Sequence, residues 1–435
     1  MRRLGIAAMA LALVVAVSCG GLSEAQKHSN QGLELQQAGK LEEAIQEYDK
    51  AIELDPHLAE AYVNRAGAYF ALGDYDSALA DATKAIELDP GLAEAYVSRA
   101  AAYSGLNEYD SALVDATKAI ELDPDLAMAY GNRAAAYLGL NEYDSALADA
   151  SKAIELDPKL ARAHMARGRV YYGTGKLEQA IADYDTAIQL DPDFAGAYVD
   201  RAIAHNDLNE YDSALADATK AIELDPKLAR AHMARGLAYH GTGKLEQAIA
   251  EYDAAIELDS DLVEAYVNRG NAYDDSGQPD RALADYSKAI ELDPDEAKAY
   301  RNRGVTYLRL GKVDEALADF SKAIELKPDY AVAYESRGDI YFGRRNYEQA
   351  VVDYTKAIEL DPANPNPYWS RATAHLMRRD SPRATGDLEM YISLSAEPDK
   401  ARAEVIAGLE AELAPSTDPG MTKVLRLVLE SLRRQ

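Results

Sequence analysis

The feature that most constrains this chain is a proline that recurs every 34 residues. It stands at Pro56, Pro90, Pro124, Pro158, Pro192, Pro226, Pro294, Pro328 and Pro362, and Ser260 fills the one vacant place in the series. A fixed period of this length is the signature of a repeat array, in which each unit buries its apolar face against its neighbours. We therefore predict a stack of similar units instead of several separate globular domains.

Within each period the residue types predict two antiparallel helices. The unit spanning residues 59–92 reads AEAYVNRAGAYFALGDYDSALADATKAIELDPGL. Small residues in both halves allow two helices to approach closely, and aromatic residues fill the space beside them. Gly or Asn stands where the turn between the helices needs a left-handed backbone. The Asp-Pro pair ends the second helix, because the residue before proline is pushed out of the helical conformation.

This unit resembles the tetratricopeptide repeat at its key positions. The matching residues are Tyr62, Ala66, Tyr69, Ala78, Ala85 and Pro90. The resemblance covers ten units in residues 25–364 and a degenerate eleventh unit in residues 365–398. It implies an all-α fold, a right-handed superhelical solenoid of antiparallel helix pairs whose first helices line a concave groove.

Residues 399–435 are predicted to form two capping helices after the last unit. These helices span Asp399–Leu413 and Met421–Arg434, on either side of a linker that contains proline. The second helix has an apolar stripe made of Val424, Leu425, Val428, Leu429 and Leu432. A basic amphipathic helix can contact anionic lipid, but the end of a solenoid needs a cap over its last apolar face. We favour the cap.

The N-terminus has the pattern of an export signal. Arg2 and Arg3 precede an uncharged apolar run, Leu4 to Val17, which is too short to span a bilayer. The segment Val15-Ala16-Val17-Ser18-Cys19 resembles a bacterial lipoprotein box, in which the cysteine is lipidated and becomes the first mature residue. Cys19 is the only cysteine of the chain, so it has no internal disulfide partner.

We therefore predict a signal peptide over residues 1–18, a lipidated Cys19 and a short tether over residues 19–24. The protein would then be a lipid-anchored membrane protein of the cell envelope, facing the periplasm or the exterior. The alternative is ordinary cleavage, for example after Ala25, which would release a soluble secreted or periplasmic protein.

The charge balance argues against nucleic acid as a partner. The formal net charge is -28, and nucleic-acid binding draws most of its free energy from Lys and Arg that neutralise phosphates. Contact with a membrane is predicted only through the N-terminal lipid. The remaining partners are proteins or peptides, whose identity the sequence does not specify.

Residue patterns for catalysis, a metal or a cofactor are missing from the sequence. His164, His205, His232 and His375 replace ring positions of their units, and the sequence holds no Cys pair and no HExxH motif. The segment Gly173-Thr174-Gly175-Lys176 lacks the first Gly and the final Ser or Thr of a phosphate loop. We predict a non-catalytic protein with no metal site and no cofactor.

An acid and a base recur with the repeat period. The base is Arg65, Arg99, Arg133, Arg167, Arg201, Arg235, Arg269, Arg303 and Arg337. The acid is Asp81, Asp115, Asp149, Asp183, Asp217, Glu251, Asp285, Asp319 and Asp353. We interpret them as a ladder of ion pairs between packed helices. Such pairs fix geometry more than they add stability, because desolvation offsets much of the attraction.

The resemblance also indicates which residues face the groove. We predict a peptide-binding groove that contains Asn64, Phe70, Asn132, Leu138, Met165, Tyr172, Met233, Asn268, Asn271, Arg301, Asn302, Leu308 and Phe342. The Asn amides can donate to and accept from the backbone of an extended peptide. The apolar and Met side chains offer adaptable contacts, which is the pattern of a peptide reader.

Some members of the family hold a C-terminal carboxylate with Lys and Asn at set groove positions. Asn271 and Asn302 match two of the Asn positions, but Val267, Val332 and Ser336 stand where the basic positions would be. This difference argues against that clamp at these positions.

The sequence thus predicts a tetratricopeptide repeat (TPR) scaffold that binds proteins or extended peptides at the bacterial cell envelope. A structural spacer, or an envelope protein that associates with copies of itself, is the alternative. The alternative draws support from two nearly identical blocks, Leu140–Gly168 and Leu208–Gly236, which differ only by Ser151 against Thr219. A site confined to one copy of a duplicated block is less expected than a repeated surface.

Overall fold

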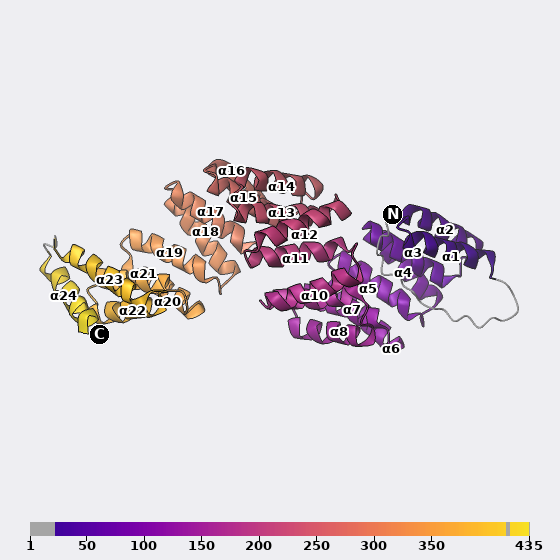
Figure 1. Cartoon of the computed structure of the whole chain (residues 1–435), viewed down its shortest axis with the longest axis horizontal. Helices are drawn as coiled ribbons and strands as arrows, with labels where there is room; N and C mark the ends of the chain where they lie inside the picture. Colours follow the sequence, from indigo (N-terminus) through magenta and orange to yellow (C-terminus); the bar gives the residue numbers. More distant parts are fainter. Residues whose placement is uncertain (1–21, 415–417, 435) are drawn as a thin grey trace. The chain divides into compact units, whose positions relative to one another are not determined.

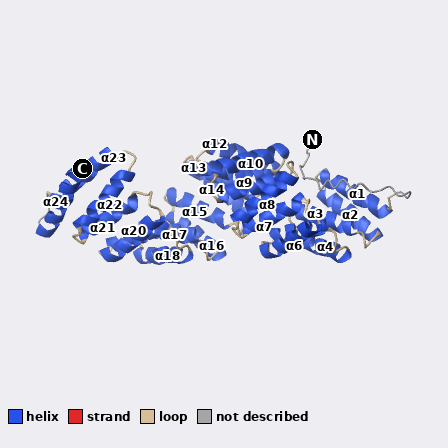
Figure 2. Ribbon diagram, turned by 90° about the horizontal axis from the view of Figure 1, so that it is seen from below, coloured by secondary structure: helices blue, strands red, loops and turns tan. Residues whose placement is uncertain are grey.

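The structure of the chain is a computed structural model that describes residues 22–414 and 418–434. The predicted signal peptide, residues 1–18, and the predicted lipid site Cys19 lie outside the described residues. Every regular element of the described part is an α-helix, as Figure 2 shows by the uniform blue of its ribbons. The predicted all-α class is confirmed. In the same part of the chain, no helix is both long and apolar enough to cross a bilayer.

The chain divides into two compact units, one ending at Leu258 and the other beginning at Asp259. Within each unit, consecutive helices pack in antiparallel pairs (Figure 1). The pairs of the first unit are α1 (Glu24–Gln37) with α2 (Leu41–Leu54), α3 (Ala59–Leu72) with α4 (Tyr75–Leu88), α5 (Ala93–Gly105) with α6 (Tyr109–Leu122), α7 (Ala127–Gly139) with α8 (Tyr143–Leu156), α9 (Ala161–Gly173) with α10 (Leu177–Leu190), α11 (Ala195–Asp207) with α12 (Tyr211–Leu224), and α13 (Ala229–Gly241) with α14 (Leu245–Leu258).

The second unit continues the same arrangement and ends in two further helices. Its pairs are α15 (Val263–Asp275) with α16 (Pro279–Leu292), α17 (Ala297–Arg309) with α18 (Val313–Leu326), α19 (Ala331–Gly343) with α20 (Tyr347–Leu360), and α21 (Asn366–Met377) with α22 (Ser381–Leu394). They are followed by α23 (Pro398–Leu413) and α24 (Pro419–Arg434).

The turn between the two helices of a pair contains a residue with a left-handed backbone conformation, as the Gly and Asn pattern predicts. The residues with positive φ are Gly39, Gly73, Asn107, Asn141, Gly175, Asn209, Gly243, Gly277, Gly311, Arg345 and Arg379. Glycine takes this conformation without a steric penalty, and asparagine tolerates it. Arg345, at φ 61°, takes it although Asn346 is the next residue. The helix register fixes the position of the turn, and the side chain has to follow.

Across the ten pairs from α1 with α2 to α19 with α20, the interior is filled in one of two ways. In six pairs a glycine of the first helix faces a ring of the second helix, namely Gly32 and Tyr48, Gly168 and Tyr184, Gly236 and Tyr252, Gly270 and Tyr286, Gly304 and Phe320, and Gly338 and Tyr354. In four pairs two alanines occupy the same places, namely Ala66 and Ala82, Ala100 and Ala116, Ala134 and Ala150, and Ala202 and Ala218. Both solutions keep the two helices close together.

The C-terminal helices cover the end of the second unit. Each begins at a proline, Pro398 and Pro419, slightly earlier than predicted, because proline fits the first turn of a helix without losing a hydrogen bond. The apolar stripe of α24 packs into a cluster formed by Val424, Leu425, Val428, Leu429, Leu432, Ala372, Leu376, Ala384, Leu388, Ile392, Val405 and Leu409. This burial accounts for the stripe as a cap.

Candidate peptide-binding groove

The recurring Arg and Asp form the ion pairs that the sequence predicts. In the second pair, Nε and Nη2 of Arg65 donate to the two carboxylate oxygens of Asp81, each at 2.7 Å. This bidentate geometry repeats along the chain and continues to Arg371 and Asp387 in α21 and α22. Each ion pair joins the first helix of a helix pair to the second helix of the same pair. Bidentate pairing adds geometric specificity, so the ladder fixes how the first helices are presented.

Several of these arginines also reach the preceding pair. Nη1 of Arg133 donates to Oγ1 of Thr117, and Nη1 of Arg337 donates to Oγ of Ser321, both at 3.4 Å. The hydrogen bond to Asp149 raises the pKa of Arg133, although partial burial lowers it. One guanidinium thus ties three helices together, and its charge is used by the scaffold and not by a ligand.

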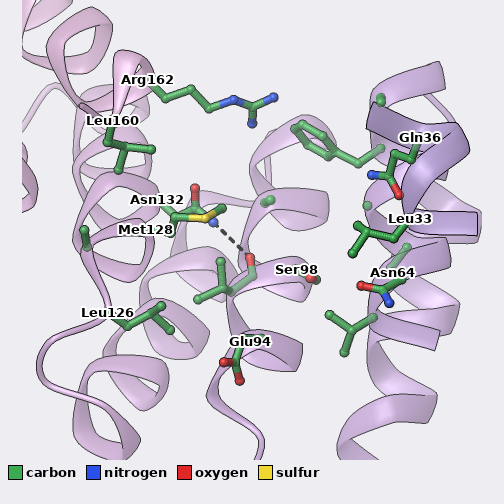
Figure 3. A pocket seen from close by; sticks show the side chains of 18 of the residues that line it. Leu33, Gln36, Asn64, Glu94, Ser98, Leu126, Met128, Asn132, Leu160 and Arg162 are labelled. Atoms are coloured by element: carbon green, nitrogen blue, oxygen red, sulfur yellow. Dashed lines mark hydrogen bonds between the residues drawn. The ribbon is translucent and has the colours of Figure 1, made fainter. Parts of the chain in front are cut away.

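The first helices of five consecutive pairs line a cavity of about 260 Å³ in the first unit (Figure 3). We call it the first-unit cavity. Its wall includes Leu33 and Gln36 of α1, Asn64 and Phe70 of α3, Glu94, Val97, Ser98 and Ala101 of α5, Met128 and Asn132 of α7, and Arg162 of α9. In Figure 3, Leu33, Gln36 and Asn64 face Leu126, Met128 and Leu160 across the opening. The first helices therefore form the hollow side of this unit.

Three of the predicted groove residues line this cavity: Asn64, Phe70 and Asn132. Nδ2 of Asn132 donates to the backbone carbonyl of Val97 at 2.9 Å, and Nδ2 of Asn64 donates weakly to Oγ of Ser29 at 3.4 Å. Each amide thus has a neighbour within the array, which holds its orientation. Asn132 keeps its side-chain carbonyl and a second N–H for a ligand, because an amide offers two donors and one acceptor oxygen.

The predicted role of the two Met residues as exposed groove contacts is not what the structure shows. Met165 is only 8% exposed and packs with Ala161, Ala187 and Ala197, and Met233 is only 7% exposed. Their flexible thioethers fill the space between successive pairs. Of the other predicted residues in this unit, Leu138 is half-buried, and the Tyr172 hydroxyl donates to Asp207 at 2.7 Å.

In the second unit, the predicted Asn residues are joined by a string of hydrogen bonds. Oδ1 of Asn271 accepts from the Tyr286 hydroxyl at 2.8 Å and from Nδ2 of Asn302 at 2.9 Å. Nη1 of Arg301 donates to Oδ1 of Asn302 at 3.1 Å. Asn268 is half-buried. These hydrogen bonds fix the orientation of the Asn271 and Asn302 amides and occupy part of their hydrogen-bonding capacity.

The predicted apolar groove residues of this unit are accessible. Leu308 is 37% exposed, and the half-buried ring of Phe342 lies 5.4 Å from that of Tyr347. Nearby, burial raises the pKa of Glu335, and the adjacent Asp339 raises it further while Arg301 lowers it. Burial also raises the pKa of Asp339, whose carboxylate accepts from the Tyr354 hydroxyl at 2.7 Å.

Family models match nearly the whole array. Models described as tetratricopeptide repeat match residues 59–92, 93–126, 127–160 and 267–331. A model described as TPR repeat matches residues 32–73, 168–208, 204–243, 242–277 and 338–377. The chain belongs to the tetratricopeptide repeat family. No curated protein matches it.

Solved structures that match this chain do so at low sequence identity. The human IFIT1 dimer with m7Gppp-AAAA is 15% identical, with a TM-score of 0.55 over 87% of this chain and 92% of that chain. Yeast Tom70 is 19% identical, with a TM-score of 0.43 over 94% and 96%. YrrB, described as a TPR protein with an unusual peptide-binding site, is 28% identical, with a TM-score of 0.32 over 42% and 95%. The first of these likenesses supports the fold alone.

Sequence reasoning missed three arginines on the hollow side of this tetratricopeptide repeat protein. Nε of Arg169 donates to Asp200 at 2.5 Å, and Nη2 of Arg230 donates to the same carboxylate at 3.3 Å. Arg162 lines the first-unit cavity. All three occupy positions that the resemblance assigns to the groove. A cation at such a position in a chain of net charge -28 was the signal that could have identified them.

Within residues 22–414 and 418–434, no three His, Cys, Asp or Glu side chains gather as ligands for a metal ion. His164 and His375, which replace aromatic residues of the repeat, are buried. Each lies beside the Asp of the Arg–Asp ion pair in the same helix pair, which is Asp183 for His164 and Asp387 for His375. Burial lowers the pKa of His375, so that residue is neutral at physiological pH.

Proposed function

We propose that this protein is a non-catalytic scaffold that binds extended peptide segments of other proteins along its first helices, at the bacterial cell envelope. The observation that carries the proposal is the first-unit cavity, which the first helices of five consecutive pairs line together. An extended peptide can contact several such helices in turn, whereas a compact small molecule needs only one or two.

The contrast between recurring and variable residues of the repeats supports the same function. The ion pairs recur nearly unchanged and hold the scaffold, while the residues of the cavity wall differ from pair to pair. Tetratricopeptide repeat proteins are generally non-catalytic scaffolds that bind proteins or peptides. The identity of the bound segment would be set by the variable wall.

A bulky side chain in the cavity is expected to abolish peptide binding without disturbing the fold. Ala101 lies in the wall on α5, so Ala101→Trp would fill the space that a peptide needs. Ala80 lies exposed on the second helix α4, so Ala80→Trp is the matched control. Binding to an array of random extended peptides should fall at least about tenfold with Ala101→Trp and stay unchanged with Ala80→Trp.

Both variants should keep the helical circular dichroism of the parent protein. If the parent protein selects no peptides from the array, the proposal of a peptide-binding scaffold fails. If Ala101→Trp binds as the parent does, the cavity is not where the peptides bind.

The envelope location rests on the lipoprotein-type start of the sequence and is part of the proposal. Cells fed a fatty-acid analogue are expected to label the protein, because Cys19 supplies a thiol at the predicted first mature residue. Cys19→Ser should remove the label and leave the precursor uncleaved or released. Equal labelling of the two proteins would contradict lipidation of Cys19.

The second candidate function is a spacer that holds two other parts of the envelope apart. It is favoured by the near-identity of Leu140–Gly168 and Leu208–Gly236, since duplication adds length without adding a new site. A spacer needs no ligand in the cavity, so the peptide array separates the two proposals.

A further inference from the structure

A second hollow lies in the last repeat of the second unit, between α20, α21 and α22 (Figure 1). Its volume is about 410 Å³, and it shares no residue with the predicted groove or with the first-unit cavity. We call it the C-terminal pocket. Its lining includes Arg371, His375, Arg378, Arg383, Gly386 and Asp387.

The charge of the chain around this pocket differs from that of the rest of the array. Residues 365–435 contain ten Lys and Arg and ten Asp and Glu, whereas residues 1–364 contain 36 and 64. The whole negative net charge therefore belongs to the earlier repeats. An anion that approaches the last repeat meets less electrostatic repulsion there than along the preceding ones.

Two arginines of the C-terminal pocket form ion pairs at the protein surface. Nε of Arg378 donates to Glu348 at 3.1 Å, and Nη1 of Arg383 donates to Asp380 at 2.8 Å. The side chains of Glu348 and Arg383 are each 70% exposed. Exposed ion pairs contribute little to stability, so an anion in the pocket can replace these partners at a small cost.

The carboxylate in the lining is already neutralised by the scaffold. Asp387 accepts from Nε of Arg371 at 2.9 Å and from Nη2 at 2.6 Å, which is the bidentate pairing of the other repeats. This pairing occupies both carboxylate oxygens and holds α21 against α22. Arg378 and Arg383 are therefore the cations that the pocket offers to a ligand.

The ring of His375 adds a polar group without a hydrogen bond. The residue is only 4% exposed, and its Nδ1 has no hydrogen-bond partner among the described residues. Nε2 lies 3.9 Å from Asp387. Burial lowers the pKa of His375, Asp387 and Asp380 raise it, and Arg371 and Arg378 lower it. Because buried polar groups are normally hydrogen-bonded, this nitrogen at the pocket marks a place where a ligand atom would be stabilised.

Gly386 keeps the C-terminal pocket open. It lies inside α22, where glycine lowers helix stability relative to alanine, and a Cβ added to it would meet nothing within 4 Å. Helix packing therefore does not require a glycine there. In the nine pairs from α3 with α4 to α19 with α20, the equivalent residue is Ala80, Val114, Ala148, Ala182, Ala216, Ala250, Ala284, Ala318 and Val352.

The three candidate donors, His375, Arg378 and Arg383, occur together only in this repeat of the sequence. The pair of α19 with α20 keeps one of the two cations and has a tyrosine in place of the histidine. Its residues at the equivalent places are Tyr341, Arg344 and Gln349. The last repeat therefore departs from the common pattern at the places that line the pocket.

We propose that the C-terminal pocket binds a phosphate monoester, whose three terminal oxygens accept from Arg378, Arg383 and Nδ1 of His375. A monoester carries about two negative charges and three acceptor oxygens, which match two guanidinium groups and one ring N–H. A phosphate diester has one charge and two terminal oxygens, so it leaves one of the three donors unpaired. The open space beside Gly386 admits the organic part of the monoester. This site is independent of the proposed peptide-binding function.

Two small phosphates test the ligand class. Methyl phosphate is a monoester, and dimethyl phosphate is the corresponding diester. Titration calorimetry of the full chain at constant ionic strength is expected to show binding of methyl phosphate in the millimolar range or tighter. Dimethyl phosphate should bind at least about tenfold more weakly, because it lacks one charge and one acceptor oxygen.

The binding should depend on the two arginines and not on net charge. Arg378→Gln and Arg383→Gln are each expected to weaken the binding of methyl phosphate at least about tenfold. Arg344→Gln is the matched control, because Arg344 pairs with Asp314 of the preceding helix pair as Arg378 pairs with Glu348. It removes the same charge outside the pocket and should leave the affinity unchanged.

Filling the pocket should have the same effect as removing a cation. Gly386→Val introduces the side chain that α20 carries at Val352, and it is expected to weaken the binding of methyl phosphate at least about tenfold. All the variants should keep the helical circular dichroism of the parent protein, because the changed side chains lie outside the core.

Three results would overturn the inference. The first is a parent protein that does not bind methyl phosphate across the millimolar range. The second is equal binding of methyl phosphate and dimethyl phosphate, which would indicate a diester such as a lipid headgroup. The third is an affinity that Arg378→Gln leaves unchanged or that Arg344→Gln lowers equally. Peptides selected by the random array would leave the proposed scaffold function standing in each case.

Discussion

Replacing Arg337 by alanine is expected to lower the free energy of unfolding by about 3–5 kcal/mol, because it leaves a buried carboxylate without its partner. The side chain of Asp353 is enclosed, and the residue is only 1% exposed. It accepts from Nε and Nη2 of Arg337 at 2.8 and 2.9 Å. Urea denaturation followed by circular dichroism would measure the change.

An ion pair on the surface of α20, the helix that carries Asp353, provides the control. Lys356 and Glu359 of α20 form an exposed ion pair at 3.1 Å, and Lys356→Ala should cost no more than about 0.5 kcal/mol. The double variant Arg337→Met with Asp353→Leu should regain most of the loss, because an apolar pair avoids desolvating two charges. A loss below about 1 kcal/mol for Arg337→Ala would mean that the ladder does not hold the helices as argued.

The second large effect is expected between the helices of the fifth pair. Gly168→Ala would place a methyl group 2.6 Å from the Tyr184 ring, which is closer than real side chains approach. Overpacking of a well-filled core costs about 1–3 kcal/mol. Tyr184→Ala should cost about 3–5 kcal/mol, because it removes a fully buried ring. Denaturant unfolding of each protein would give these values.

The two changes are expected to couple. In the Tyr184→Ala background, Gly168→Ala should stabilise the protein by up to about 1 kcal/mol, because alanine is the better helix former and the ring is gone. Ala66 with Ala82 shows that the fold accepts two alanines here. Gly131→Ala in α7, where the new methyl group meets nothing within 4 Å, should stabilise the parent protein equally. The same sign for Gly168→Ala in both backgrounds would contradict the pairing.

Local sequence patterns were enough to predict the fold class, because interactions between residues close in the sequence determine the helices and turns of each repeat. Period, turn residues and helix stops act within one unit, and Asn107, for example, takes the positive φ expected of a turn residue. The partner of each glycine was not predictable. Gly168 meets Tyr184 through the angle at which two helices cross, and this angle depends on packing across the whole pair.

The candidate site was less predictable because it depends on contacts between units. Met165 occupies a position assigned to the groove, but it is drawn into the core beside Ala197 of the next pair. Arg162 looks in the sequence like an ordinary solvated cation. Its ring partner Phe70 becomes its neighbour only when the first helices of several pairs curve around one cavity.

Site-specific photo-cross-linking in intact cells tests the central claim most directly. A photoreactive amino acid would replace Ala71 in the cavity wall, Leu308 on α17 or, as control, Ala80 on the outer helix α4, and captured proteins would be identified by mass spectrometry. We predict that Ala71 and Leu308 capture a small set of envelope proteins and that Ala80 does not. Capture of nothing, of copies of this chain alone, or of the same proteins from all three positions would contradict a groove that binds partners.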